Sequence, residues 1–151
     1  ILHQGRVELQ AGENGHKLLA HSHTMEKETA IFRFLDYRII KSLIELHPEN
    51  GETSSKLSVS LGVPENINIS GNNITYPMNV SIQDENNVLN IEVNIVGNFE
   101  IDKDTEDLQS FIEINAPAIL FPYIRAHITT ITSLSGIKPV ILPTLNMTKN
   151  K

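Results

Sequence analysis

The sequence predicts one α+β domain, in which a four-stranded antiparallel sheet carries two helical segments on one face. Apolar and polar residues alternate along three segments, 57–63, 76–83 and 89–95, as they do in strands with one buried face. After residue 102 the apolar spacing becomes helical. A chain of 151 residues with 40% hydrophobic content suits a single hydrophobic core.

The first 24 residues are expected to form an appendage to a domain that spans residues 25–151. They hold His3, His16, His21 and His23 but no clear hydrophobic period, and the spacing of these histidines fits no closed metal site. The segment is interpreted either as native, disordered chain or as the remnant of a tag, because Met25 reads like a native start. We therefore expect it to be dispensable for folding and to bind no metal.

Residues 30–46 place apolar side chains at both even and odd positions. This pattern predicts a long strand that is covered on both sides, one of them by a second subunit. A helix over residues 36–46 is the alternative, because short apolar runs do not distinguish the two structures. Residues 47–55 are rich in turn-forming types and are expected to form a crossover or turn.

The three alternating segments are expected to form the remaining strands of a meander with one covered face. The last two are joined by D-E-N-N at residues 84–87, a hairpin signal because Asn tolerates left-handed backbone geometry. Pro77 cannot donate to a ladder of hydrogen bonds, so it is expected at the start of its strand or at a sheet edge.

Two helical segments are expected to follow. The first begins at Asp104 or Thr105 and ends near Asn115, and Pro117 opens the second, which Gly136 ends. Apolar residues of the second segment recur at steps of four, four and three, and so form one stripe. We expect this stripe to be an oligomer interface, formed by Leu120, Ile124, Ile128 and Ile131.

An apolar loop bracketed by Pro139 and Pro143 follows the second helix. It is more hydrophobic than a surface connection usually is. From the residues alone, two interpretations stay open: the loop packs on its own sheet and closes the core, or it forms a binding surface.

The L-F-P-Y-x-R sequence that begins at Leu120, the hydroxyl-rich helix around it and the glycine-terminated apolar loop resemble the SecB-like protein-export chaperones. The resemblance covers the chain after about Met25. It implies an ATP-independent holdase, most often a tetramer, that binds unfolded polypeptide in an apolar groove walled by the loop. The peptide-binding residues expected from this resemblance are Leu57, Val59, Leu61, Ile137, Val140, Ile141 and Leu142.

One departure from the family concerns the C-terminus. SecB-like chaperones continue into a further helix and a flexible tail that helps docking on the SecA motor, whereas this chain ends soon after Met147. Docking on SecA is therefore in doubt, and the expected partners are unfolded clients, either many or a dedicated one such as an antitoxin. A non-chaperone oligomeric scaffold and a small-molecule binding domain are the alternatives from other classes.

The sequence lacks the motifs that are typical of other function classes. The chain holds no cysteine and no motif for nucleotide, metal or nucleophilic chemistry, so no enzyme activity and no cofactor are expected. Its net charge of −6, without a basic cluster, argues against nucleic-acid binding. Without an apolar run of membrane-spanning length or a secretory signal, a cytoplasmic location is expected.

Overall fold

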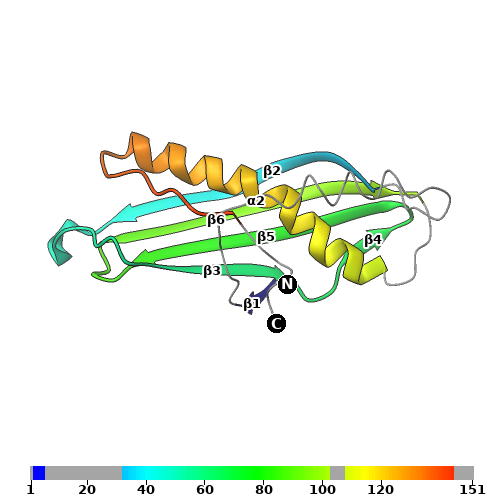
Figure 1. Ribbon diagram of the computed structural model, residues 1–151, viewed down its shortest axis with the longest axis horizontal. Coiled ribbons are helices and arrows are strands. Elements are labelled where there is room, and N and C mark those ends of the chain that lie inside the picture. The colour runs from blue at the N-terminus through cyan, green and yellow to red at the C-terminus, as the bar shows by residue number, and fades with distance from the viewer. Residues whose placement is uncertain (1, 6–31, 103–107, 145–151) are drawn as a thin grey trace.

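The computed structural model describes residues 2–5, 32–102 and 108–144, and it confirms the α+β class (Figure 1). Its antiparallel sheet has six strands in the order β1-β3-β5-β6-β2, with the short β4 paired to β5 beside this path. Four long strands match the expected ones, and β1 and β4 are additional. The elements are β1 (Leu2–Gly5), β2 (Phe32–Leu46), the 3-10 turn η1 (Pro48–Asn50), β3 (Leu57–Pro64), β4 (Asn68–Ser70), β5 (Asn73–Asp84), β6 (Leu89–Ile101) and α2 (Leu108–Leu134).

The order of the strands corrects the expected meander. Strands β3, β5 and β6 do follow one another, and the β5–β6 hairpin is confirmed, with Asn87 at a φ of 60° in its turn. Strand β2, however, pairs with β6 at the opposite edge of the sheet from β3. Strand β6 offers β2 a partner along nearly its whole length, from Leu46 opposite Leu89 to Phe32 opposite Ile101.

Two irregularities explain the mixed apolar pattern of β2. The register with β6 shifts between Phe34 and Asp36 and again between Ile39 and Lys41, so that Leu35 and Ile40 are extra residues. Each extra residue exchanges the faces of all residues that follow it. Within this chain, strand β2 is therefore an edge strand with one half-buried face, and its two extra residues are exposed. Cover of its other side by a second subunit stays a prediction.

The helical part of the chain forms one continuous helix, α2, instead of the two segments expected. Pro117 and Pro122 lie inside it. Each proline lacks an N–H, which leaves the carbonyl four residues earlier without a helical partner, and such sites bend helices. The ribbon of α2 does change direction part-way along (Figure 1). The expected caps, Asp104 and Thr105, lie outside the described residues.

The apolar stripe of α2 packs on the sheet of its own chain. The helix lies over β6, β2 and β5, and Leu120, Ile124 and Ile128 are fully buried in the core, with Ile131 half-buried beside them. This corrects the expectation of an oligomer interface, because side chains buried in this way are not accessible to a second copy. The helix comes close to the sheet at Gly97 of β6, where an added Cβ would lie 2.6 Å from Cδ2 of Leu120.

Pro77 lies inside β5, not at its start or on an edge strand. Opposite it, β6 pairs through Val96. On the other side of β5, the pairing with β4 ends at Thr75 and the pairing with β3 begins at Asn79. Pro77 therefore lies beside a gap in the ladder. Its missing N–H is tolerated there, as it is at a sheet edge, because no neighbouring strand requires a hydrogen bond from it.

The N-terminal segment also contains a regular element, contrary to expectation. Strand β1 pairs antiparallel with the end of β3, with Leu2 opposite Pro64 and Gly5 opposite Leu61. Residues 6–31 lie outside the described part of the chain, so the domain boundary near Met25 stays a prediction.

A buried carboxylate fastens the β5–β6 hairpin to the segment before β3. Asp84 is 3% exposed and accepts hydrogen bonds from the backbone N–H groups of Ser54, Val88 and Leu89 at 2.7–2.8 Å. Burial raises the pKa of this carboxyl, but the backbone N–H donors lower it by more, so its net pKa lies below the ordinary value.

The substitution Asp84→Asn is expected to lower the free energy of unfolding by about 1–3 kcal/mol, because an amide cannot accept from all three N–H groups. Since the folded pKa is lowered, the contribution is fully present above the ordinary pKa of about 3.9 and disappears as the pH falls through the folded pKa. Urea unfolding from pH 7 to pH 3 measures this difference. Glu52→Gln, at a nearby exposed carboxylate, is the control, and an equal effect in both variants would contradict the assignment.

Candidate functional site

One face of β3 is not covered by the helix. Strand β3 is absent from the strands that α2 contacts in the described part of the chain. Its residues Val59 and Leu61 lie opposite Ile82 and Val80, which are core residues, so they share the face on which α2 lies. Together with Leu57 they form what we call the apolar strip of β3.

Exposure changes along this strip. Leu57 is 36% exposed, Val59 is half-buried and Leu61 is 4% exposed. The strip therefore runs from the core at Leu61 to the surface at Leu57. Among the residues first expected to bind peptide, Leu57 is the strand residue most accessible to a partner.

The outer edge of β3 is half occupied. Residues 61–64 pair with β1, whereas residues 57–60 pair only with β5 in the described part of the structure. In an antiparallel strand every second residue directs its N–H and C=O outward, and an edge with free groups is a template for a further strand. Among the described residues, residues 57–60, which we call the open half of this edge, thus combine backbone groups without a second strand partner with the exposed end of the apolar strip.

The apolar loop after α2 runs back along the helix and is held by hydroxyl groups. Thr129 Oγ1 donates to the Val140 carbonyl at 2.8 Å, and the Val140 N–H donates to Thr132 Oγ1 at 2.9 Å. Farther along, Arg125 Nη1 donates to Thr144 Oγ1 at 3.3 Å. Two hydroxyl groups of the helix thus pair with the polar backbone of the loop.

This docking divides the loop into inner and outer residues. Val140 and Leu142 are 7% and 4% exposed and belong to the same hydrophobic cluster as Leu61, and the half-buried Ile137 packs against that cluster. Ile141 points outward and is 77% exposed. Each interpretation of the loop thus holds for different residues. Val140 and Leu142 close the core, and Ile141 is accessible to a partner.

A second exposed apolar site joins β2 to α2. The rings of Tyr37 and Tyr123 stack with centroids 4.4 Å apart, and both side chains are 38% exposed. The same two elements are also joined by a hydrogen bond between Ser42 Oγ and His127 Nε2, which lie 2.8 Å apart. Tyr37 was missed because the alternation expected of a strand is interrupted by the extra residue at Leu35.

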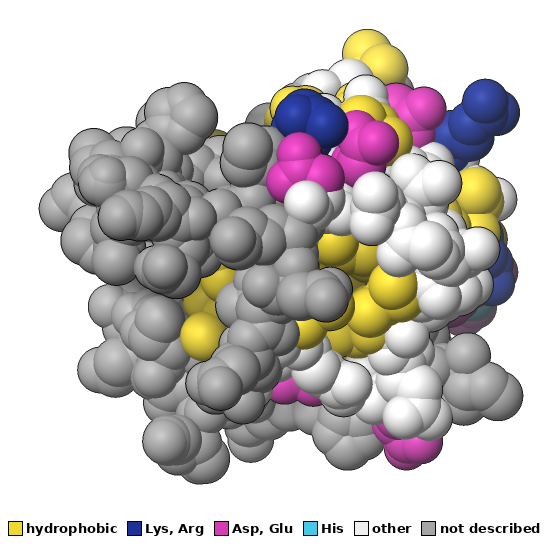
Figure 2. All heavy atoms as spheres, turned by 90° about the vertical axis from the view of Figure 1, so that its right-hand side faces the viewer, with side chains coloured by type: hydrophobic (Ala, Val, Ile, Leu, Met, Phe, Trp, Pro, Cys, Tyr) yellow, Lys and Arg dark blue, Asp and Glu magenta, His cyan; other side chains and the backbone are white. Residues whose placement is uncertain are grey.

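Apolar surface also gathers at the end of the molecule that carries β4. Ile69 of β4 is 41% exposed, and Ile67 before it is half-buried against the core. Viewed from this end, apolar side chains lie in the middle of the face among polar and acidic ones (Figure 2).

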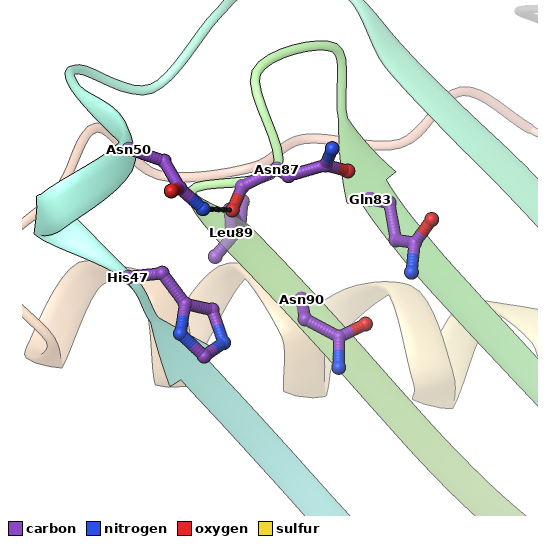
Figure 3. Close-up of a pocket in the computed structure, with 6 residues that line it drawn as sticks. All are labelled: His47, Asn50, Gln83, Asn87, Leu89 and Asn90. Carbon is purple, nitrogen blue, oxygen red and sulfur yellow. Dashed lines mark hydrogen bonds between the residues drawn. The ribbon is translucent and has the colours of Figure 1, made fainter.

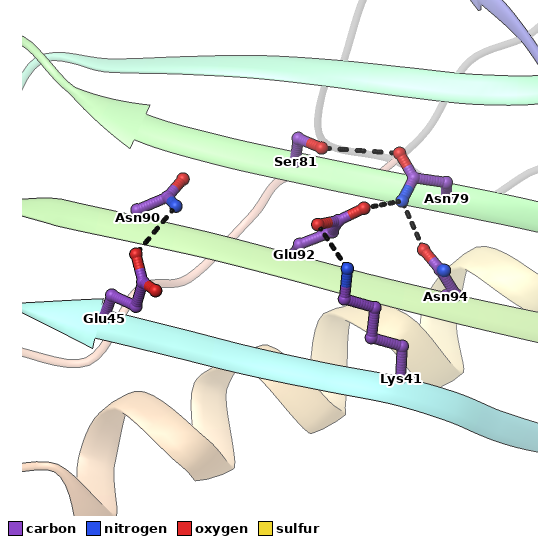
Figure 4. A network of polar contacts seen from close by, with 7 residues as sticks. All are labelled: Lys41, Glu45, Asn79, Ser81, Asn90, Glu92 and Asn94. Carbon is purple, nitrogen blue, oxygen red and sulfur yellow. Dashed lines mark hydrogen bonds and ion pairs between the residues drawn. The ribbon is translucent and has the colours of Figure 1, made fainter.

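The opposite face of the sheet carries paired polar side chains. Lys41 Nζ and Glu92 Oε1 are 3.0 Å apart, and Asn79 donates to Glu92 at 3.2 Å and to Asn94 (Figure 4). Asn90 donates to Glu45 at 3.3 Å in the same way across β6 and β2. Ser81 donates to Asn79 of its own strand, and the other side chains drawn in Figure 4 pair across strands, so the arrangement supports the sheet.

A small polar cavity lies at the hairpin end of the sheet. It measures about 250 Å³ and is lined by His47, Asn50, Gln83, Asn87, Leu89 and Asn90 (Figure 3). Its size lies below the range of about 300–1,000 Å³ that is typical of small-molecule sites, and its lining is mostly amides. Within residues 2–5, 32–102 and 108–144, no three metal-ligating groups come together and no helix is long and apolar enough to cross a membrane.

The fold is that of a SecB-like chaperone. It superimposes on the Mycobacterium tuberculosis SecB-like chaperone Rv1957, solved in complex with a ChAD peptide from the Rv1956 HigA1 antitoxin, with a TM-score of 0.61. The match covers 87% of this chain and 98% of that one at 14% sequence identity, a level at which it describes the fold alone.

Sequence comparison assigns the family. The family model described as preprotein translocase subunit SecB matches residues 52–149, about two thirds of the chain. The chain therefore belongs to the SecB family, and the resemblance noted from its motif is confirmed.

Two relatives share higher identity over shorter stretches. The chain is 48% identical over 58 residues to an uncharacterized protein of Methanocaldococcus jannaschii and 37% identical over 59 residues to the protein-export protein SecB of Anaplasma phagocytophilum. These stretches cover 38% and 36% of this chain, and 37% of each relative.

The loop clamp can be tested with Thr132→Val, which keeps the shape of the side chain but removes the acceptor of the buried Val140 N–H. The free energy of unfolding is expected to fall by about 1–3 kcal/mol, the cost of an unsatisfied buried donor. Thr130→Val, at an exposed position of the same helix, is the matched control. Thermal and urea unfolding measure both, and equal stability of the two variants would show that the clamp does not hold the loop.

Proposed function

We propose that the chain is an ATP-independent chaperone that holds extended, non-native polypeptide along β3. The observation that carries this proposal is that, in the described part of the chain, residues 57–60 have no partner on the outer edge of β3, beside an apolar strip that α2 does not contact. Membership of the SecB family and the fold shared with a SecB-like chaperone support a chaperone role.

The site fits an extended chain for two physical reasons. Free backbone groups of residues 57–60 can pair with any polypeptide in a strand conformation, whatever its sequence. The exposed parts of Leu57 and Ile141 can each bury apolar side chains of a client, at about 25 cal/mol per Å² removed from water. Ordering the client opposes this gain, so one site binds modestly and without strong sequence preference.

We further propose that the clients are either several export substrates or one dedicated protein such as an antitoxin, met in the cytoplasm. An extended apolar segment is the chemistry that this surface recognises. The mycobacterial SecB-like chaperone was solved with a peptide from an antitoxin. Because this chain shares its fold, that complex supports the second possibility.

We also propose that the protein is a homo-oligomer, with a tetramer as the expected size. Because the stripe of α2 is core, the interface is assigned instead to β2, a 15-residue edge strand. Leu35 and Ile40 are 50% and 62% exposed on it among charged side chains, and exposed apolar side chains on a long edge strand are candidates for cover by a second copy. Several modest sites on one assembly would then hold one long client by avidity.

Removal of exposed apolar side chains is expected to weaken client capture. The variants Leu57→Ser and Ile141→Ser should each bind an unfolded client several-fold more weakly. The melting temperature should stay nearly unchanged in Ile141→Ser, whose side chain is 77% exposed, and should fall in Leu57→Ser only as far as in a control of equal exposure, because Leu57 is 36% exposed. Suppression of the aggregation of a chemically unfolded client, without ATP, is the measurement.

Ile114→Ser on α2 is the matched control, because Ile114 is as exposed as Leu57 and lies on another element. Full capture by both site variants would place the binding surface elsewhere. A requirement for ATP would contradict the holdase mechanism itself.

The oligomer is tested by Ile40→Lys, which places a charge on the exposed edge strand and should lower the molar mass measured by light scattering. The variant should stay folded, since Ile40 is 62% exposed. Ile128→Asp, by contrast, buries a charge in the core and should unfold the chain. A monomeric wild-type protein at micromolar concentration would contradict the proposed assembly.

A further inference from the structure

The N-terminal strand occupies half of the edge that the proposed function assigns to the client. Strand β1 pairs with residues 61–64 of β3, directly beside the open residues 57–60. We propose that β1 is a built-in competitor of the client, which a long client displaces to occupy the whole edge of β3. This inference rests on the proposed function and adds a regulatory element to the same site.

The lengths of the strands make the competition unavoidable. Strand β3 has eight residues, of which β1 covers four, and the other four have no outer partner among the residues that the structure describes. Strands in folded proteins are most often about 5–6 residues long, and shorter pairings are marginal in water. A client that pairs with more than the open four residues therefore meets β1.

The pairing of β1 with β3 is weak enough for a client to displace β1. It is four residues long, with the sequence L-H-Q-G, and it pairs with a single neighbouring strand. Gly5 is opposite Leu61 and Gln4 is opposite Gly62, and glycine weakens strand pairing. Pro64, opposite Leu2, has no N–H to donate.

The covalent connection to the domain favours β1 over a free peptide of the same sequence. Residues 6–31 join β1 to β2, so β1 binds its site intramolecularly. A connection of this kind gives an effective concentration on the order of millimolar. A client must exceed this advantage, and it can do so by adding contacts with Leu57 and the open backbone groups that β1 does not reach.

The competition has a measurable size. The apparent dissociation constant of a client equals its intrinsic value divided by the fraction of molecules with a free edge. If β1 is docked in 70–90% of molecules, releasing it tightens client binding by about 3–10-fold. Strengthening β1 must weaken binding, so the two changes have opposite signs.

The experiment uses the full chain and, as the probe, fluorescently labelled α-lactalbumin kept unfolded by reduction and carboxymethylation. The double substitution His3→Pro/Gln4→Pro removes two adjacent N–H groups, one of which must point at β3. It is expected to lower the Kd by about 3–10-fold. Gln4→Val/Gly5→Val introduces strand-forming residues and is expected to raise the Kd.

The outcomes separate this inference from the proposed function. If the wild-type chain binds the probe but neither double variant changes the Kd, or if the proline variant binds more weakly, β1 is not a competitor while the chaperone activity stands. If the wild-type chain does not bind the probe at all, the proposed function fails and the inference with it. Circular dichroism of each variant ensures that changes in Kd are compared only between folded proteins.

Discussion

The close approach of α2 to the sheet at Gly97 determines how the rest of the molecule is arranged. The side chain of Leu120 comes too close to Gly97 for a Cβ atom to fit there without a shift, and Gly97 is flanked across the strands by Tyr37 and Tyr76. A glycine between two tyrosines thus creates a space for one leucine of the helix. Because this contact fixes the middle of α2 on β6, the helix covers β2, β6 and β5 and leaves β3 uncovered.

The two edges of the sheet consequently differ. Strand β2 lies beneath α2 on one face, and its two most exposed apolar residues, Leu35 and Ile40, are the extra residues of its two irregularities. Strand β3 lies beyond the helix, and its apolar strip is closed only at its inner end, where the docked loop shares the core with Leu61. We assign self-association to the first edge and client binding to the second, because residues 57–60 of β3 combine backbone groups that have no second strand partner among the described residues with an apolar strip that lies beyond the helix.

The sequence was most informative where local pattern and burial agree. The alternation in β3, β5 and β6, the hairpin at residues 84–87 and the apolar stripe of the helix were all predicted, since each depends on neighbours along the chain. The family motif from Leu120 to Arg125 and the loop after Gly136 were sufficient to predict a SecB-like protein.

The errors arose where the outcome depends on residues far apart in the sequence. The extra residues in β2 are visible only against the register of β6, and a helix that continues through Pro117 and Pro122 requires support from the sheet below it. The stripe was assigned to an interface because a pattern of apolar residues does not say whether the same chain or a second copy buries it. Likewise, L-H-Q-G carries no strand signal of its own, and β1 forms because β3 provides an edge.

Amide hydrogen exchange of the wild-type protein, with and without a saturating unfolded client, tests the central claim most directly. If clients add a strand to β3, outward-pointing amides within residues 57–60 become protected when the client binds, while the amides of β6, already paired on both sides, do not change. Unchanged exchange in β3, together with new protection confined to β2 or to residues 137–144, would contradict the account.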